Sequence, residues 1–341
     1  MTGADISDVF QKANYCPVYL IYGSETFLIN QMLKKMYQAL IADEVGDFNY
    51  ERLDGPAVSP AQVVASASTL PVFAEKRLVV VRDAPWFSGS KGEENGKDLM
   101  QPLITYLENP SPSTCLVMVA HEKIDSRRKI VKMIQKVGRV IEYAPLKGTE
   151  LNRWIESKVK QRGKTIEKPA LEYLSFAAGN NLAVLNQEIE KAVIYIGEAS
   201  KITIGDVVET VSRSSYLSVF DVIDAVAEKR SLSAVLCLRE ILKSGEPEIK
   251  ILALLARQVR IMLQIQALNK KGYTTNHISS DLGIHPFVVK KGLEQCRNFS
   301  SRELVTVLEL LLETDVSIKT GKGNPSSLLE TVVLKMCSPA H

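Results

Sequence analysis

The passage from an apolar run into an amphipathic helix near residue 23 is the feature that most constrains the fold. Residues 17–22 (PVYLIY) are apolar and rich in residues that favour strands. They end at Gly23-Ser24, after which apolar residues recur at helical spacing: Phe27, Leu28, Met32 and Leu33. A strand, a tight turn and a helix in this order begin a nucleotide-binding α/β domain. We therefore expect that architecture in the first part of the chain.

The turn itself lacks the residues of a phosphate-binding loop. That loop needs the pattern G-x-x-x-x-G-K-[ST], whose backbone N–H groups and lysine hold the phosphates. Residues 23–30 read GSETFLIN, with one glycine and no lysine, and the Glu25 carboxylate would repel a phosphate. The residues therefore predict an ATPase-like scaffold that holds no cofactor and works by binding a partner.

Strand and helix patterns alternate between residues 17 and 143. We expect strands at 18–22, 48–53, 77–82, 115–120 and 139–143, and helices at 26–42, 60–68, 96–108 and 126–137. The segments 78–81 and 115–119 are continuous apolar runs, which strands buried on both faces require. We therefore predict a RecA-like α/β domain over residues 1–143, with helices covering a parallel sheet. The segment 88–97 is expected to be an exposed, mobile loop.

Two acidic residues at the ends of apolar strands are candidate Mg²⁺ ligands. Asp83 follows one strand and Glu122 follows another. Acidic residues are common at strand ends, and no phosphate loop accompanies these two, so we predict no metal ion. His121, His277 and His285 lie in no pattern typical of a catalytic triad. We interpret them as surface or capping residues and assign no catalytic residue.

The strand signal fades beyond Pro145, and the remaining chain reads as helices. Between 144 and 213 we expect helices at 150–162, 170–178, 182–196 and 204–211. A small helical unit directly after a RecA-like layer is the anatomy of an AAA+ lid domain, and 213–215 is interpreted as a linker. Residues 214–341 predict a helical bundle, with helices at 219–228, 232–243, 248–271, 276–282, 286–296, 301–319 and 325–336.

Residues 275–298 have the rhythm of a helix–turn–helix motif, with Gly283 at the turn. Lys290, Lys291 and Arg297 follow the turn and would reach DNA phosphates if the second helix read bases. Phe287 occupies the first turn of that helix, however, and favours packing inside the bundle. A DNA-binding protein that uses this segment is therefore the alternative function, next to an AAA+-like scaffold.

The segment 69–76 joins the expected helix 60–68 to the expected strand 77–82 and is called the apolar connection below. Pro71 ends the helix and restricts Leu70 to an extended backbone. Val72 and Phe73 follow, although connecting segments are normally polar because they face water. The residues alone leave two readings open. The pair is either tucked back under its own helix, which is the commoner arrangement, or held out for a pocket on a partner.

Composition sets broad limits on the class of protein. A chain of 341 residues is expected to form two or three domains, and 45% hydrophobic with 24% charged residues excludes global disorder. A net charge of +3 is too small to diagnose nucleic-acid binding. The five cysteines are scattered, which predicts reduced thiols. The first residues do not resemble a signal peptide, and no apolar run approaches the ~20 residues of a membrane span, so we expect a cytoplasmic protein.

Several segments, in order, resemble the delta-subunit family of bacterial DNA polymerase III, whose members are clamp-loader subunits. The resemblance covers nearly the whole chain, and its motifs are weak singly but specific in their order and spacing. They are the opening strand and turn 18–28, the segment 69–81, the lid motifs 154–155, 188–191 and 202–203, and the C-terminal motifs 318–321 and 328–330.

The resemblance implies three domains: a RecA-like layer (1–143), a lid (144–213) and a helical collar (214–341) that joins a five-subunit ring. Other members of that ring would be gamma/tau-type and delta-prime-type subunits. It implies a subunit of the polymerase holoenzyme, a nucleotidyltransferase, that neither binds nor hydrolyses ATP. It also implies weak contact with primed DNA, without sequence specificity, and no contact with membranes.

The resemblance also assigns a role to the apolar connection. In the family, a hydrophobic pair at this tip inserts into a pocket on the sliding clamp (the beta subunit), and this contact helps to open the ring. Val72 and Phe73 match the pair, so Leu70, Pro71, Val72 and Phe73 are the predicted clamp-binding residues. The family pattern favours a larger first residue, so Val72 implies a shallower contact.

Overall fold

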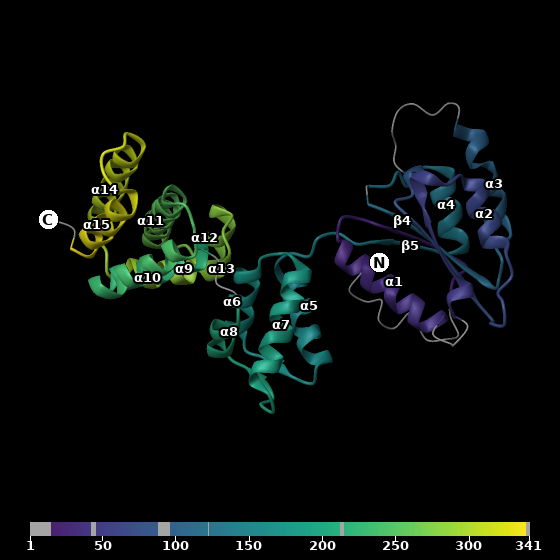
Figure 1. The fold of residues 1–341 in the computed structure, drawn as a ribbon, viewed down its shortest axis with the longest axis horizontal. Helices are drawn as coiled ribbons and strands as arrows, with labels where there is room; N and C mark the ends of the chain where they lie inside the picture. The colour runs from purple at the N-terminus through teal and green to yellow at the C-terminus, as the bar shows by residue number, and fades with distance from the viewer. Residues whose placement is uncertain (1–14, 42–45, 88–95, 122, 212–214, 339–341) are drawn as a thin grey trace. The chain divides into compact units, whose positions relative to one another are not determined.

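The chain forms two compact units, Met1–Lys147 and Gly148–His341. The computed structural model describes residues 15–41, 46–87, 96–121, 123–211 and 215–338 (Figure 1). The predicted loop 88–97 and the predicted linker 213–215 lie largely outside these residues, and Glu122 lies wholly outside them. Of the predicted boundaries, the one near residue 143 lies close to the division between the units. The second, near residue 213, falls inside the helical unit and stays a prediction.

Within the described residues of the first unit, five strands form one parallel sheet in the order β2-β3-β4-β1-β5. The strands are β1 (Val18–Tyr22), β2 (Tyr50–Asp54), β3 (Arg77–Arg82), β4 (Thr114–Ala120) and β5 (Arg139–Glu142). Leu116 of the central strand β4 lies opposite both Val18 and Val79. Every residue of β4 is buried, as a strand covered on both faces requires. The predicted parallel sheet is confirmed.

Helices cover both faces of this sheet (Figure 1). They are α1 (Thr26–Leu40), α2 (Pro60–Ser68), α3 (Gly96–Glu108) and α4 (Lys129–Val137). Leu20 and Met118 point to one face, where they form a core with Val63 of α2, Leu103 of α3 and Ile134 of α4. Alternate residues such as Tyr19 point to the other face, which α1 covers. The sheet is therefore buried on both faces, and the segments at its two edges are the places where side chains reach solvent.

Two predicted boundaries in this unit are wrong for a local reason. The strand expected at 48–53 begins at Tyr50, because Gly46–Asn49 forms a 3₁₀ turn, η2. The helix expected at 126–137 begins at Lys129. A turn at Asp125 delays it: the carboxylate accepts the N–H of Arg127 at 3.0 Å, and the carbonyl accepts the N–H of Arg128 at 3.1 Å.

Helix α2 has strong signals at both ends, and these place the apolar connection that follows it. Ser59 caps the helix in a reciprocal capping box with Gln62, and Pro60 occupies the first helical position. At the other end, the Thr69 N–H donates to the Ser66 carbonyl at 3.2 Å before the chain turns extended. The helix therefore ends at Ser68, where the sequence predicts, with Thr69 as the capping residue before Leu70.

The second unit begins with the helices α5 (Gly148–Gln161), α6 (Lys168–Ala178), α7 (Leu182–Ile196) and α8 (Ile204–Thr210). Their existence is as predicted. A two-stranded parallel sheet between β6 (Thr165–Ile166) and β7 (Lys201–Ile202) was not predicted. Two-residue strands are too short to show an alternating pattern, and the pairing joins segments far apart in the chain. It ties the start of α6 to the start of α8.

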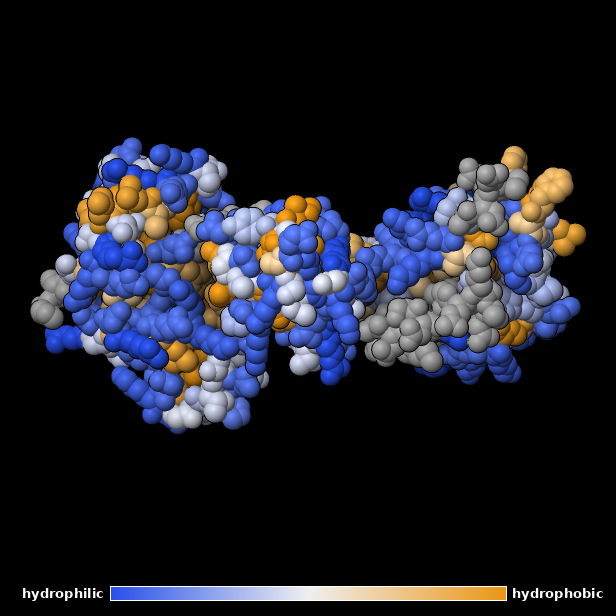
Figure 2. Space-filling model, turned by 90° about the horizontal axis from the view of Figure 1, so that it is seen from below, coloured by the Kyte–Doolittle hydropathy of each residue, from blue (hydrophilic) through white to orange (hydrophobic). Residues whose placement is uncertain are grey.

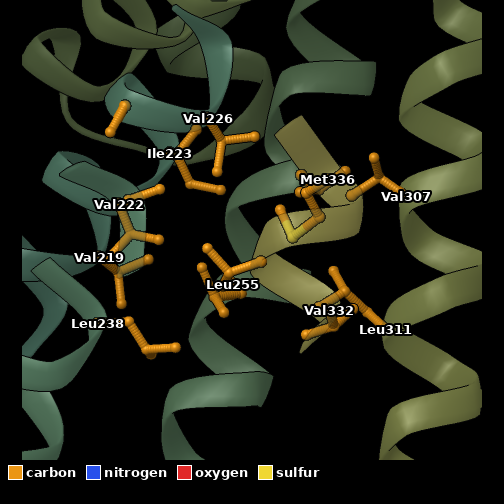
Figure 3. Packing of buried hydrophobic residues seen from close by; sticks show 14 of the residues in the cluster. Val219, Val222, Ile223, Val226, Leu238, Leu255, Val307, Leu311, Val332 and Met336 are labelled. Atoms are coloured by element: carbon orange, nitrogen blue, oxygen red, sulfur yellow. The ribbon is translucent and has the colours of Figure 1, made fainter. Parts of the chain in front are cut away.

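The rest of this unit is a helical bundle. It comprises α9 (Ser215–Ala227), α10 (Ser231–Lys243), α11 (Glu248–Lys270), α12 (Thr275–Leu282), α13 (Pro286–Cys296), α14 (Ser301–Lys319) and α15 (Pro325–Cys337). Figure 3 shows side chains of α9, α10, α11, α14 and α15 in a common interior, among them Val222 of α9, Leu255 of α11, Val307 of α14 and Met336 of α15. The predicted bundle is thus present.

A chain of polar side chains crosses the bundle beside this apolar core. The buried Gln258 amide donates to Gln295 at 2.9 Å, and the Gln295 amide donates to Asp224 at 2.7 Å. Lys291 pairs with the second oxygen of Asp224 at 2.6 Å. Buried polar groups are costly unless they are hydrogen-bonded. This series of bonded side chains therefore favours one mutual arrangement of α9, α11 and α13.

Helix α11 is long and apolar enough to cross a membrane by length and composition alone. From the sequence, residues 248–271 are expected only as a helix of the bundle. Its buried residues, including Ile251, Leu255 and Met262, belong to the core of the helical unit, and about 44% of its most apolar window is buried. This placement is that of a core helix.

Candidate functional site

The apolar connection presents its side chains to solvent. Leu70 is 72% exposed, Val72 is 44% exposed and Phe73 is 91% exposed, while Pro71 is partly buried. The commoner reading from the residues, a pair tucked back under its own helix, is therefore wrong. Apolar side chains project from the first unit among hydrophilic neighbours, at the right of Figure 2. Exposed apolar side chains grouped in this way are typical of surfaces that bind a partner.

Phe73 also has an unusual backbone conformation. Its φ is +51°, in the left-handed region that glycine favours and bulky residues rarely adopt. Such a conformation costs of order 1–3 kcal/mol and persists where the surrounding structure holds it. Because the Phe73 ring is almost fully exposed, its packing contributes almost nothing to the stability of the fold. Strain at an exposed aromatic residue is typical of binding sites.

The connection is held by a buried side chain from another segment. Asn49, which is 1% exposed, accepts the Val72 N–H at 2.7 Å and donates its amide to the Val72 carbonyl at 2.8 Å. The side-chain amide thus satisfies both backbone groups of Val72, as a neighbouring strand would. Asn49 is a positioning residue that fixes the base of the apolar connection.

A second set of bonds joins the same segments through Arg77, the first residue of β3. The Arg77 guanidinium donates to the Phe48 carbonyl at 3.1 Å and pairs with the Glu51 carboxylate. The same carboxylate oxygen accepts the Ser66 hydroxyl of α2 at 2.5 Å. Phe48 itself is 71% exposed. The end of α2, the turn η2 and the start of β3 are therefore braced against one another.

Phe48 and Asn49 were missed in the sequence analysis because residues 48–53 read as a strand. As the first residue of a half-buried strand, Phe48 would be expected to point its ring toward the covered face of the sheet. The 3₁₀ turn instead leaves its ring in solvent and buries the following amide. The available signal was Asn49, since asparagine is depleted in strands and frequent in turns.

Helix α2 adds a small-residue stripe beside the connection. Ala61, Ala65 and Ser68 are exposed and lie at i, i+4 and i+7, on one side of the helix. Ala67 points inward and is buried. Because these side chains are short, another protein surface can approach the helix backbone closely next to Leu70.

The turn η2 and the apolar connection lie at the amino edge of the sheet, because they directly precede β2 and β3. Ligands of open parallel sheets bind at the opposite, carboxyl edge. There, the Gly23 N–H donates to the Ala120 carbonyl and the Glu25 N–H to the Tyr143 carbonyl, both at 3.1 Å. A Cβ at Gly23 would lie 2.2 Å from the Tyr143 oxygen, and burial raises the pKa of Glu25. The N–H groups that would face a phosphate at this turn thus already donate to carbonyls of the protein itself.

The remaining candidates at the carboxyl edge form one pair. Asp83, with a φ of +54°, accepts from His121 at 2.9 Å, and both side chains are partly exposed. Among the described residues, no group of three or more His, Cys, Asp or Glu side chains is placed to hold a metal ion. This pair is therefore an isolated surface contact in the described part of the chain.

The helix–turn–helix-like segment packs into the helical unit. The Phe287 ring stacks on Phe176 of α6 at 4.9 Å between ring centroids. Lys290 pairs with Glu172 at 2.6 Å, and Lys291 pairs with Asp224 at 2.6 Å. The first turn of α13 and its lysines thus contact neighbouring helices, as the packing interpretation predicts.

His285 caps this helix. Its Nδ1 accepts the N–H of Phe287 at 3.2 Å, and its Nε2 lies 3.4 Å from the Ser175 hydroxyl. Burial lowers the pKa of His285, with a smaller opposing effect from Glu172. A neutral ring is required for the capping bond, because a protonated Nδ1 cannot accept. The capping interpretation of this histidine is confirmed.

Comparison with known proteins relates both units to one family. Residues 19–144 match the family described as DNA polymerase III, delta subunit, and residues 217–336 match its C-terminal domain. DNA polymerase III subunit delta of Bacillus subtilis is 32% identical, over 97% of this chain and 96% of that protein. The probable DNA polymerase III subunit delta of Aquifex aeolicus is 24% identical, over 87% of this chain and 84% of that protein.

A solved structure gives the same result in three dimensions. The DNA clamp loader delta protein of Bacillus subtilis superposes with a TM-score of 0.62 at 32% identity. The comparison covers 98% of this chain and 99% of that chain. The likeness therefore extends over both units.

Proposed function

Because this chain belongs to the DNA polymerase III delta-subunit family, we propose that it binds the sliding clamp through its apolar connection and opens the ring for loading onto primed DNA. The single observation that carries this proposal is the exposed and braced set Leu70, Val72 and Phe73. These side chains contribute little to the fold and are held in place for a partner. The chain itself performs no chemistry in this proposal.

The apolar connection can supply substantial binding energy. Burying a fully exposed large apolar side chain contributes about 1.5–3 kcal/mol, so Leu70 and Phe73 together supply roughly 3–6 kcal/mol by this measure. Val72, which is only 44% exposed, adds less. Association and ordering cost several kcal/mol in return. Because Asn49 already holds Val72, less of the ordering cost remains to be met on binding. A rigid apolar tip is thus suited to fill a pocket on the clamp.

Opening the ring requires a difference in affinity, in addition to affinity itself. A protein shifts a closed–open equilibrium only by binding the open form more tightly. Moving a ring from 1% to 99% open takes about 5.5 kcal/mol of differential binding. The exposed small-residue stripe of α2, next to Leu70, would press beside a protomer interface of the clamp. Contacts of α2 that form only with the open ring would supply the difference.

In this proposal, ATP is bound and hydrolysed by partner subunits. The support within this chain is the carboxyl edge, where the amides of Gly23 and Glu25 already donate to protein carbonyls. Rearrangement of the partners would expose or hide the apolar connection. The first unit is then a RecA-like AAA+ domain that serves as a clamp-binding platform, and the protein acts in the cytoplasm.

The helical unit would provide the ring contacts. We assign residues 144–213 as the lid and residues 214–341 as the collar of a five-subunit ring with gamma/tau-type and delta-prime-type subunits. Primed DNA would be touched weakly and without sequence specificity. The alternative, a sequence-specific DNA reader at 275–298, has less support because Phe287, Lys290 and Lys291 contact neighbouring helices.

The test is binding of the full chain to its cognate sliding clamp by surface plasmon resonance. We expect sub-micromolar binding by the wild type and loss of binding by Val72→Ala/Phe73→Ala, with an unchanged circular dichroism spectrum. Equal binding by both proteins would show that another surface is used. A wild type that does not bind the clamp would refute the proposed function, and tight sequence-dependent DNA binding would favour the alternative.

A further inference from the structure

We propose that Phe48 is a second aromatic anchor for the sliding clamp, an inference that rests on the proposed function above. Phe48 lies in the turn η2 and is 71% exposed, almost the same fraction as Leu70. It comes from a different segment of the chain. A single exposed apolar residue is ordinary on protein surfaces. The argument therefore depends on how Phe48 is attached to the apolar connection.

The attachment involves the carbonyl of Phe48 itself and the side chain of the next residue, Asn49. The Phe48 carbonyl accepts from Arg77 at 3.1 Å, which ties it to the start of β3. The next residue, Asn49, is buried and makes two hydrogen bonds with the backbone of Val72. Phe48 is thus held one residue from the group that positions Val72 and Phe73.

This geometry identifies the occupant as the same partner that covers the apolar connection. Asn49 follows Phe48 directly and bonds to Val72, so Phe48 lies on a segment that is tied to the apolar connection. In this proposal, the protein surface that buries Val72 and Phe73 also covers Phe48. Interface energy concentrates in clustered aromatic and other large side chains that are shielded from water. In this proposal, the clamp would offer an apolar contact for Phe48 beside the pocket that receives Phe73.

A rigid pair of anchors from two segments also has a specificity consequence. A flexible apolar loop adapts to many pockets, whereas two anchors at a fixed separation fit one spacing. The bonds from Arg77 and Asn49 fix the backbone positions of both segments. The chain would thus recognise the clamp by two apolar contacts at once.

The experiment compares the full chain with Phe48→Ala and Leu99→Ala for binding to the cognate clamp. Leu99 is the matched control, because it is 54% exposed in the first turn of α3, which begins at the carboxyl edge of the sheet. We expect Phe48→Ala to weaken binding about 10-fold or more. Leu99→Ala should bind as the wild type does, and Phe48→Leu should recover part of the loss. Melting curves would show that all variants are folded.

The outcomes separate this inference from the proposed function. If Val72→Ala/Phe73→Ala loses clamp binding while Phe48→Ala binds normally, Phe48 is no anchor and the proposed function stands. If Leu99→Ala weakens binding as much as Phe48→Ala does, the effect is not specific and the inference fails. If the wild type does not bind the clamp, both fail.

Discussion

Replacing Asn49 with alanine should release the apolar connection without unfolding the domain. The substitution removes two hydrogen bonds, of 2.7 and 2.8 Å, between a buried amide and the backbone of Val72. Each neutral hydrogen bond contributes about 1 kcal/mol net, so the loss is about 2 kcal/mol. Val72 is 44% exposed, so water can replace the lost partners and keep the cost near this value.

We expect this loss to appear as local opening, because the connection is a surface segment with few apolar contacts of its own. A change of 2 kcal/mol corresponds to about a 30-fold change in the opening equilibrium, since 1.36 kcal/mol is a factor of 10. Hydrogen–deuterium exchange of peptides covering residues 69–77, followed by mass spectrometry, measures it. Exchange in this segment should rise about 30-fold in Asn49→Ala.

Asn30→Ala is the matched control for this measurement. Asn30 is exposed and accepts one bond from Arg82 at 2.9 Å, at the other edge of the sheet. Its loss should leave exchange in residues 69–77 unchanged. Unchanged exchange in Asn49→Ala would refute the positioning role of Asn49. A uniform rise across the whole unit would also refute it, because Asn49 would then support the core in general.

Three further predictions concern stability. Gly23→Ala should destabilise the first unit by more than about 3 kcal/mol in urea unfolding, because a Cβ would lie 2.2 Å from a backbone oxygen. Gly163→Ala, also at positive φ but with nothing within 4 Å, should cost its own unit only about 1 kcal/mol. Gln295→Ala should cost about 3 kcal/mol, since it breaks the buried polar chain; an unchanged urea midpoint would contradict this. The pKa of His285 is lowered from 6.5 by burial, so its contribution is full above about pH 6.5 and is lost as pH falls through the lowered value. His285→Asn, which keeps a capping acceptor, should flatten the fall in unfolding free energy below pH 6.5. An unaltered pH profile would show that folding does not change the pKa of this histidine.

Much of the first unit was predictable because its signals are local. Continuous apolar runs at 78–81 and 115–119 indicated buried parallel strands, and four of the five strands were placed within a residue at each end. The capping residues of α2 and the proline after it marked where the apolar connection begins. These signals act over a few residues, through backbone propensity and side-chain spacing, and a single sequence carries them.

The absence of a phosphate-loop pattern and the apolar pair Val72-Phe73 were likewise visible in the sequence. Family resemblance then assigned the pair a partner, and the comparisons show the family. Whether the pair is exposed was not visible, and the commoner reading was wrong. Exposure depends on what the rest of the chain leaves uncovered, which is a property of packing in three dimensions.

The sequence by itself therefore determined the order of strands and helices, the lack of phosphate-loop residues at 23–30 and the position of the apolar connection. Only the tertiary structure decided that Asn49 holds Val72, 23 residues away in the chain, and that Phe48 is exposed beside it. It also decided that the Tyr143 carbonyl crowds the turn at Gly23. The physical reason is that side-chain periodicity reports neighbours along the chain. Hydrogen bonds and burial between distant segments arise only once the sheet has brought those segments together.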